Sequence, residues 1–287
     1  MSLGRRSLLL GLLAACLNTP AIKAAHAAPA RRVVAIGGRV TEIVFALGAQ
    51  SMLVARDSTS VHPPEALALP DIGYMRAVSP EGVLAAEPDL ILATIGSGPP
   101  EAIDILRKSS VRVVDVPQDF NTESLIRSVE LIGVELDRRS EAEALNKAIK
   151  VEFDALELKV KGQSTQRKRV LFILSINDGQ YNVSGLNTAA SAMISYAGAD
   201  NLFSEFEGYK TVGSEAILTA NPDAIVLISR HGSDAVITLQ SLSADPLIGQ
   251  TEAVKAGAII TMPGDYLLGF GPRTPKAAMD LHAALFG

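Results

Sequence analysis

The chain has 287 residues, 48% of them hydrophobic and 20% charged, a balance that excludes a disordered or collagen-like chain and predicts a globular protein with a full core. The formal net charge is −5 and Lys and Arg form no basic cluster, so we expect no nucleic-acid partner. The single cysteine, Cys16, lies in the first apolar run, so a chain that loses this run can form neither a disulfide nor a thiolate metal site.

Residues 1–28 have the pattern of a cleaved signal peptide. Arg5 and Arg6 give a basic start, an apolar stretch follows over 8–17, and small residues at 25–28 offer a cleavage site. The apolar stretch is shorter than the ~20 residues that a permanent membrane-spanning helix needs. Lipid attachment at Cys16 is the alternative, because the residues before it resemble a bacterial lipobox. Either route predicts export from the cytoplasm.

Short apolar strands alternate with amphipathic helices through the first half of the remaining chain. The predicted strands are Val33–Ile36, Met52–Ala55, Leu90–Thr94 and Val111–Val116, and the predicted helices are Val40–Leu47, Pro80–Ala86, Pro99–Lys108 and Glu123–Gly133. Such alternation is typical of a parallel sheet covered by helices, and therefore of the α/β class.

A charge-rich stretch without Gly or Pro follows Asp137 and continues to about Lys161. Its apolar residues recur at helical spacing, which predicts one helix of roughly 35 Å. A new strand begins at Val170–Leu174.

The chain contains an internal repeat. Residues 81–92 align without a gap on residues 215–226, and each segment reads as a short helix, a Pro-Asp break and a buried strand. Two similar α/β lobes are therefore expected over 31–136 and 167–287, joined by a long connecting helix over 137–166. Ligands commonly bind in the cleft between two such lobes.

Two segments carry a family resemblance. Gly73-Tyr74-Met75-Arg76-Ala77-Val78-Ser79-Pro80-Glu81-Gly82 and Tyr266-Leu267-Leu268-Gly269-Phe270-Gly271-Pro272-Arg273-Thr274-Pro275 resemble signature segments of periplasmic haem-binding proteins of bacterial ABC importers. The Pro-Asp repeat and the long helix resemble the wider class that carries ferric siderophores, haem and cobalamin. The resemblance implies a periplasmic receptor that holds ferric haem (ferric protoporphyrin IX) in its cleft and delivers it to an ABC permease with ATPase subunits. A ferric siderophore or cobalamin is the alternative cargo.

The resemblance assigns Tyr74 as the axial ligand of the haem iron. A phenolate is a hard anion that suits Fe(III). Because the free phenol has a pKa near ~10, a nearby cation must help to stabilise the anion, and Arg does so without losing its own proton. By position, Arg230 resembles the arginine that takes this role across the cleft. Arg76 either meets a haem propionate or is a surface cation.

Further pocket residues are less defined. Tyr209 occupies in the second lobe the place that Tyr74 holds in the first, and it could ligate, stack or merely pack. The stretch 175–181 lacks the His that some members use as a second ligand, so Tyr181 or His231 could replace it, although five-coordinate haem is the simpler arrangement. The segment 269–273 precedes a helix for which we expect Thr274 as the N-cap and Pro275 as the first residue. Phe270 in this segment either stacks on the porphyrin or has only a structural role.

The sequence lacks complete motifs for zinc binding, dinucleotide binding and serine hydrolysis. His62, His231 and His282 are the only histidines after the leader, so a three-His zinc site is hard to assemble. Gly37-Gly38 with Asp57 downstream resembles the opening of a dinucleotide fold, but the G-x-G-x-x-G spacing is missing. No G-x-S-x-G motif occurs. We therefore expect a binding protein and not an enzyme.

We expect contact with the membrane only through the permease. Docking on the permease would use exposed acidic residues. Receptors that the chain resembles present one acid per lobe, and the matching positions are Glu101 in the first lobe and Asp234 in the second. An acid near a helix N-terminus is also favoured by the helix dipole alone, which is the structural alternative.

Overall fold

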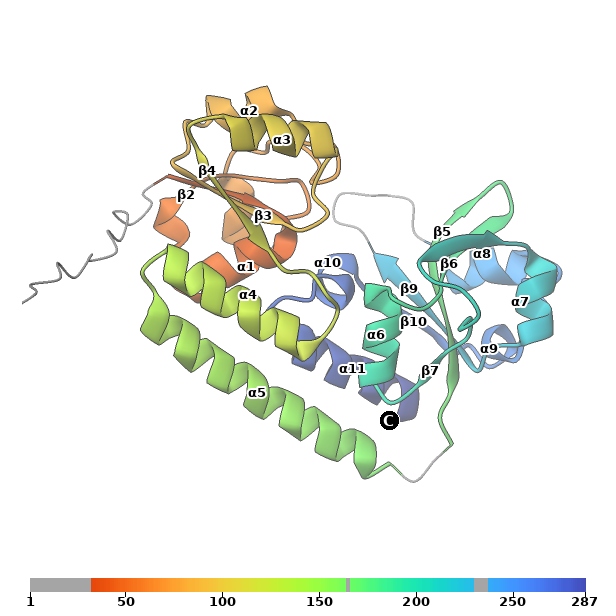
Figure 1. Cartoon of the computed structure of the whole chain (residues 1–287). Coiled ribbons are helices and arrows are strands. Elements are labelled where there is room, and N and C mark those ends of the chain that lie inside the picture. Colours follow the sequence, from red (N-terminus) through yellow and green to blue (C-terminus); the bar gives the residue numbers. More distant parts are fainter. Residues whose placement is uncertain (1–31, 164–165, 230–236) are drawn as a thin grey trace, which may run out of the picture.

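The computed structural model describes residues 32–163, 166–229 and 237–287 (Figure 1). Cys16, the leader, Arg230, His231 and Asp234 lie outside the described residues. The described chain forms two sheets, each with helices packed against it, and the α/β two-lobe fold expected from the sequence is confirmed.

The first sheet is parallel throughout, in the strand order β2-β1-β3-β4. Its elements are β1 (Val33–Ile36), α1 (Gly38–Ala46), β2 (Leu53–Arg56), α2 (Pro80–Ala85), β3 (Leu90–Thr94), α3 (Pro100–Lys108), β4 (Arg112–Val116) and α4 (Thr122–Glu135). The second strand begins one residue later than expected, because Gln50–Met52 forms a short 3-10 helix.

Helices cover both faces of this sheet. Every residue of β1 and β3 is buried, as expected for central parallel strands. Val33 and Ala35 pack with α1 and α4 on one face, whereas Val34 and Ile36 pack with α2 and α3 on the other. The alternation of side chains along a strand therefore divides the core of this lobe into two layers.

The second lobe repeats this arrangement and adds a hairpin. Its elements are β5 (Arg169–Asn177), β6 (Gln180–Ser184), α6 (Ala189–Tyr196), β7 (Asp200–Asn201), β8 (Tyr209–Val212), α7 (Ser214–Ala220), β9 (Ala224–Ser229), α8 (Leu239–Ala244), α9 (Glu252–Lys255), β10 (Ile259–Pro263), α10 (Gly264–Leu268) and α11 (Thr274–Phe286). The parallel order β7-β5-β9-β10 matches β2-β1-β3-β4. In addition, β6 pairs antiparallel with the end of β5, and β8 pairs antiparallel with β6.

The Pro-Asp repeat has a structural cause. The aligned segments form α2-β3 in one lobe and α7-β9 in the other. In each, the Asp carboxylate accepts a hydrogen bond from the backbone N–H of an arginine at the start of the lobe's first strand. The distance is 3.2 Å from Arg32 N to Asp89 Oδ1 and 2.7 Å from Arg169 N to Asp223 Oδ2. The aspartate thus joins the two central strands of its sheet at their first residues.

The long helix α5 (Arg139–Lys161) packs against α4 of the first lobe and α11 of the second (Figure 1). Its buried Ile149 belongs to the core of the first lobe and its buried Leu156 to that of the second. Within the three described ranges, no helix is both long and apolar enough to cross a bilayer.

A mostly buried ionic cluster also joins the lobes. Arg273, which precedes α11, donates its backbone N–H to Glu42 Oε1 and its guanidinium to Glu42 Oε2, both at 2.9 Å. The same guanidinium reaches Asp265 Oδ2 at 3.1 Å. Glu42 lies in α1, so the cluster fixes the first helix of one lobe against α10 and the start of α11 in the other lobe.

Candidate ligand-binding site

Tyr74 lies in the loop between β2 and α2, on a backbone that is held in place. The preceding Gly73 has a φ of 92°, which favours glycine, and its carbonyl accepts the Ser58 N–H at 2.8 Å. The carbonyl of Tyr74 itself accepts the Ala77 N–H at 2.7 Å. The side chain is 45% exposed, so a fixed backbone presents an accessible phenol.

Met75 fastens the other side of the same loop. Its side chain is buried in the first lobe, and its carbonyl accepts the Gly98 N–H at 2.9 Å. The Val78 N–H in turn donates to the Gly98 carbonyl at 2.7 Å. The loop that carries Tyr74 is therefore bonded to the loop between β3 and α3, and Tyr74 and Arg76 both remain exposed.

Tyr209 is the first residue of β8 in the second lobe. The pKa of the Tyr209 phenol is raised, and burial is the main cause. Hydrogen bonds with the Thr188 side chain and the Ala190 N–H, and the positive charge of Arg76, act in the opposite direction but are smaller. The hydroxyl thus lies at the N-terminus of α6, while the residue is 37% exposed. Arg76 of the first lobe therefore lies within electrostatic range of this phenol.

Two candidate pocket residues, Tyr181 and Phe270, are buried in this structure. Tyr181 donates its hydroxyl to Asp245 Oδ2 at 2.8 Å, and burial followed by this hydrogen bond raises its pKa well above the usual value. Phe270 packs edge-on against Phe120 at 5.2 Å between ring centroids and lies beside the buried Arg39. Neither side chain is accessible to a ligand in this structure.

The segment 269–273 joins the lobes. The predicted start of the last helix is wrong by one residue, because α11 begins at Thr274 with Arg273 as its N-cap residue. The Thr274 hydroxyl donates to the Gly271 carbonyl at 2.7 Å and does not cap the helix. A Cβ on Gly271 would lie 2.9 Å from Cδ of Glu42, so a side chain there would push the interlobe cluster apart. Glycine at this position is explained by the close approach of α1.

The described histidines do not form a metal site. His282 is buried and its Nδ1 lies 2.9 Å from the Ala197 carbonyl oxygen. Burial and the charge of Arg273 lower the pKa of His62. Among the residues that the structure describes, no three His, Cys, Asp or Glu side chains are grouped so as to hold a metal ion.

The Gly37-Gly38 turn begins α1, and the protein supplies its own anion there. Asp57 Oδ1 accepts the Gly37 N–H at 2.9 Å, and the Asp57 carboxylate is fully buried. A carboxylate at this place is favoured by the helix dipole and takes up the position that a pyrophosphate occupies in a dinucleotide fold.

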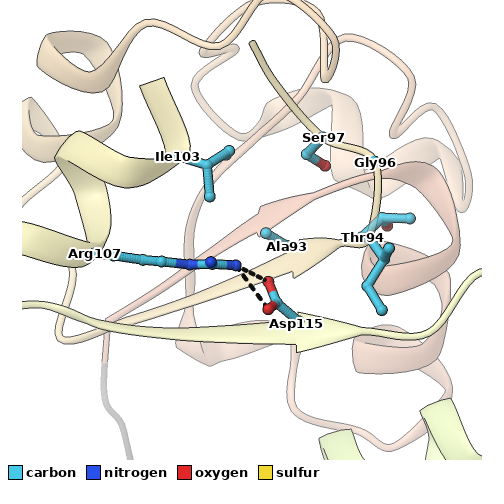
Figure 2. A pocket seen from close by; sticks show the side chains of 8 residues that line it. Ala93, Thr94, Gly96, Ser97, Ile103, Arg107 and Asp115 are labelled. Carbon is cyan, nitrogen blue, oxygen red and sulfur yellow. Dashed lines mark hydrogen bonds and ion pairs between the residues drawn. The ribbon is translucent and has the colours of Figure 1, made fainter. Parts of the chain in front are cut away.

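A small cavity of about 100 Å³ lies between α3, β4 and the loop after β3 (Figure 2). Arg107 of α3 extends across it to Asp115 of β4 and forms an ion pair at 2.7 Å. At ~30 Å³ per water, the cavity has room for about three waters and is far too small for a porphyrin.

Glu101 is exposed in the first turn of α3, directly after the loop that holds Met75. Its position agrees with an accessible surface acid. The dipole of α3 alone favours an acid in its first turn. The docking role of Glu101 stays a prediction.

The sequence analysis missed Glu42 and the role of Asp57. Glu42 had a visible signal, an acid among the apolar residues Val40, Ile43 and Val44, which indicates a buried charge with a partner. Asp57 directly follows β2, and the sequence analysis uses it only in the comparison with a dinucleotide fold.

The family model for periplasmic binding proteins matches residues 33–266. The periplasmic heme-binding protein BhuT in complex with two hemes is 37% identical, with a TM-score of 0.84 over 88% of this chain and 97% of that chain. A periplasmic heme-binding protein from Pseudomonas aeruginosa is 32% identical, with a TM-score of 0.83 over 90% of this chain and 93% of that chain. A vitamin B12-binding protein of Pectobacterium carotovorum is 27% identical over 91% of this chain and 90% of its own length.

These relatives are solute-binding proteins and not enzymes, and substrate-binding proteins of ABC transporters work with a permease and an ATPase. The family indicates a periplasmic or other extracytoplasmic location. The chain belongs to the periplasmic binding protein family, within the group of ABC substrate-binding proteins for haem, siderophores and cobalamin.

Proposed function

We propose that the chain binds ferric haem between its lobes, with the Tyr74 phenolate on the iron, and delivers it to an ABC importer. The observation that carries this proposal is an exposed tyrosine on a backbone that hydrogen bonds fasten on both sides, two residues before the exposed Arg76. The solved structures at 37% and 32% identity are heme-binding proteins by name, which supports the same cargo.

Exposed aliphatic side chains occur in loops that are bonded to the loops of the two tyrosines, which supports a flat apolar ligand. Ile95 is exposed in the loop whose Gly98 bonds to Met75. Leu186 is exposed beside Tyr209, and its carbonyl accepts the Gly208 N–H at 2.8 Å. A porphyrin has two apolar faces and anionic propionates, so these side chains suit its faces and Arg76 suits a propionate.

Cobalamin is the second candidate, because the vitamin B12-binding relative covers 91% of the chain. Equilibrium titration of the purified protein with ferric hemin and separately with cyanocobalamin distinguishes the two cargoes. We expect saturable hemin binding and no competition by cyanocobalamin. Binding of cyanocobalamin with no saturable hemin binding would replace the haem proposal by the second candidate.

Arg230, directly after β9, is proposed to stabilise the iron-bound phenolate. Replacing Arg230 by Ala is expected to leave haem binding detectable, to raise the apparent pKa of the bound tyrosine and to speed haem release. Loss of a group that supports a metal ligand typically costs ~10–100-fold in affinity. The rate of hemin transfer to apomyoglobin measures the change, and a rate equal to that of the unaltered protein would remove Arg230 from the site.

Glu101 and Asp234 are proposed to face arginines of the permease. Changing both to Lys should leave hemin affinity intact and slow docking by ~10-fold or more at low salt, because charge reversal removes electrostatic steering. The measurement is haem-dependent stimulation of ATP hydrolysis by the reconstituted importer. Glu123→Lys is the matched control, since Glu123 is exposed in the first turn of α4, on the opposite face of the sheet. Full stimulation by the double variant, or an equal loss with Glu123→Lys, would contradict the docking role.

A further inference from the structure

Asp57 forms a buried hydrogen-bonded cluster that the proposed ligand chemistry does not use directly. Its Oδ1 accepts the Gly37 N–H at 2.9 Å and the Ser60 hydroxyl at 2.6 Å. Its Oδ2 accepts the Thr59 N–H at 3.0 Å and the Thr59 hydroxyl at 2.6 Å. Four donors thus compensate for the burial of the carboxylate, which would otherwise be strongly unfavourable.

The carboxylate fixes the turn that follows β2. The Thr59 hydroxyl donates to Asp57 and also accepts the Gly38 N–H at 3.1 Å, so the turn is bonded to the first residues of α1. The Ser60 N–H donates to the Asp57 carbonyl at 3.1 Å. The conformation of residues 57–60 therefore depends on the Asp57 side chain.

This turn contacts the residues on both sides of Tyr74. The Ser58 N–H donates to the carbonyl of Gly73 at 2.8 Å. The Thr59 Oγ1 atom lies 3.9 Å from Sδ of Met75. The Asp57 cluster, defined as Asp57, Thr59 and Ser60, thus lies beneath the loop that presents the phenol.

We propose that Asp57, acting through Thr59, is a positioning residue for Tyr74, an inference that rests on the proposed haem function. Asp57 touches no ligand. Its Oδ2 holds Thr59, whose hydroxyl contacts Met75, whereas its Oδ1 holds Ser60 and the start of α1. Of the two hydroxyls bonded to the carboxylate, that of Thr59 contacts Met75 of the tyrosine loop, whereas that of Ser60 bonds to Thr41 of α1. A ligating atom must be held within ~0.5 Å, so the packing of this turn controls how well the phenolate meets the iron.

Replacing Asp57 itself threatens folding, so the test changes its two hydroxyl partners instead. Three variants of the full chain compare the Thr59 hydroxyl, bonded to Oδ2, with the Ser60 hydroxyl, bonded to Oδ1. Thr59→Val removes the hydroxyl that contacts the tyrosine loop at almost unchanged volume. Thr59→Ser keeps that hydroxyl. Ser60→Ala is the matched control, because it removes a hydroxyl bonded to the same carboxylate at the same 2.6 Å on the side of Thr41. All three are compared with the unaltered protein.

The readouts are hemin affinity, the phenolate-to-iron charge-transfer band, and amide exchange of residues 73–78 without haem. We expect Thr59→Val to lower hemin affinity by ~10-fold or more, to shift the band and to speed exchange over 73–78. Thr59→Ser should restore all three, and Ser60→Ala should lower the unfolding temperature while changing none of them.

The two proposals fail in different ways. Equal effects of Thr59→Val and Ser60→Ala, or no effect of Thr59→Val on exchange over 73–78, would overturn the positioning role while haem binding stands. If the unaltered protein binds no hemin but Thr59→Val alone speeds this exchange, the proposed function fails and the control of Tyr74 by the Asp57 cluster is supported.

Discussion

Tyr74→Phe should lose more ferric haem affinity than any other single change at the site. The substitution removes the oxygen that is proposed to bind iron and almost no volume, so the loop fastened at Gly73 and Met75 should keep its shape. Loss of an outer-shell partner of a metal ligand costs ~10–100-fold in affinity, and loss of the ligand itself should exceed this. Hemin titration measures the affinity, and thermal unfolding checks the fold.

Tyr181→Phe is the matched control for this prediction. It deletes the same hydroxyl from a buried tyrosine of the second lobe, where the partner is Asp245. We expect a loss of about 1 kcal/mol in the free energy of unfolding, the typical net value of one hydrogen bond, and unchanged hemin affinity. Hemin affinity that falls equally in both variants, or in neither, would remove Tyr74 as the ligand.

Glu42→Gln should give the largest loss of stability outside the apolar cores. The Glu42 side chain is 9% exposed and accepts two hydrogen bonds from Arg273. Burial acts to lower the pKa of Arg273, but the hydrogen bonds and charges of Glu42 and Asp265 outweigh it and raise that pKa. Breaking a buried pair by changing one partner costs ~3–5 kcal/mol. Arg273 is 26% exposed and keeps Asp265, so we expect about 3 kcal/mol.

Chemical denaturation of Glu42→Gln and Asp115→Asn tests this difference. The ion pair of Asp115 with Arg107 is almost half exposed on both sides, and such pairs contribute ~0–1 kcal/mol. The two free energies of unfolding should therefore differ by ~2 kcal/mol or more. A Glu42→Gln variant as stable as Asp115→Asn would show that the interlobe cluster contributes little.

Most of the fold could be predicted from local patterns. Apolar runs that are buried on both faces, such as β1 and β3, and a Pro-Asp break before each repeated strand determine the two parallel sheets. The hairpin β5-β6 was missed although Asp178-Gly179, with φ values of 50° and 71°, is a strong hairpin signal.

The candidate site was less predictable because accessibility depends on tertiary packing. Tyr74 and Tyr181 have the same chemistry, but only the first lies on a surface loop. Phe270 belongs to a glycine-rich segment that suits close approach to a ligand, and the group that approaches is instead Glu42 of the other lobe. Partners more than 200 residues apart in the sequence, such as Glu42 and Arg273, leave no local pattern that pairs them.

The absorption spectrum of the protein with one equivalent of ferric hemin tests the central claim most directly. Coordination by the Tyr74 phenolate predicts a Soret band together with a phenolate-to-iron charge-transfer band, and loss of the charge-transfer band in Tyr74→Phe. A hemin complex without that band, or with the same band after Tyr74→Phe, would contradict iron coordination by Tyr74.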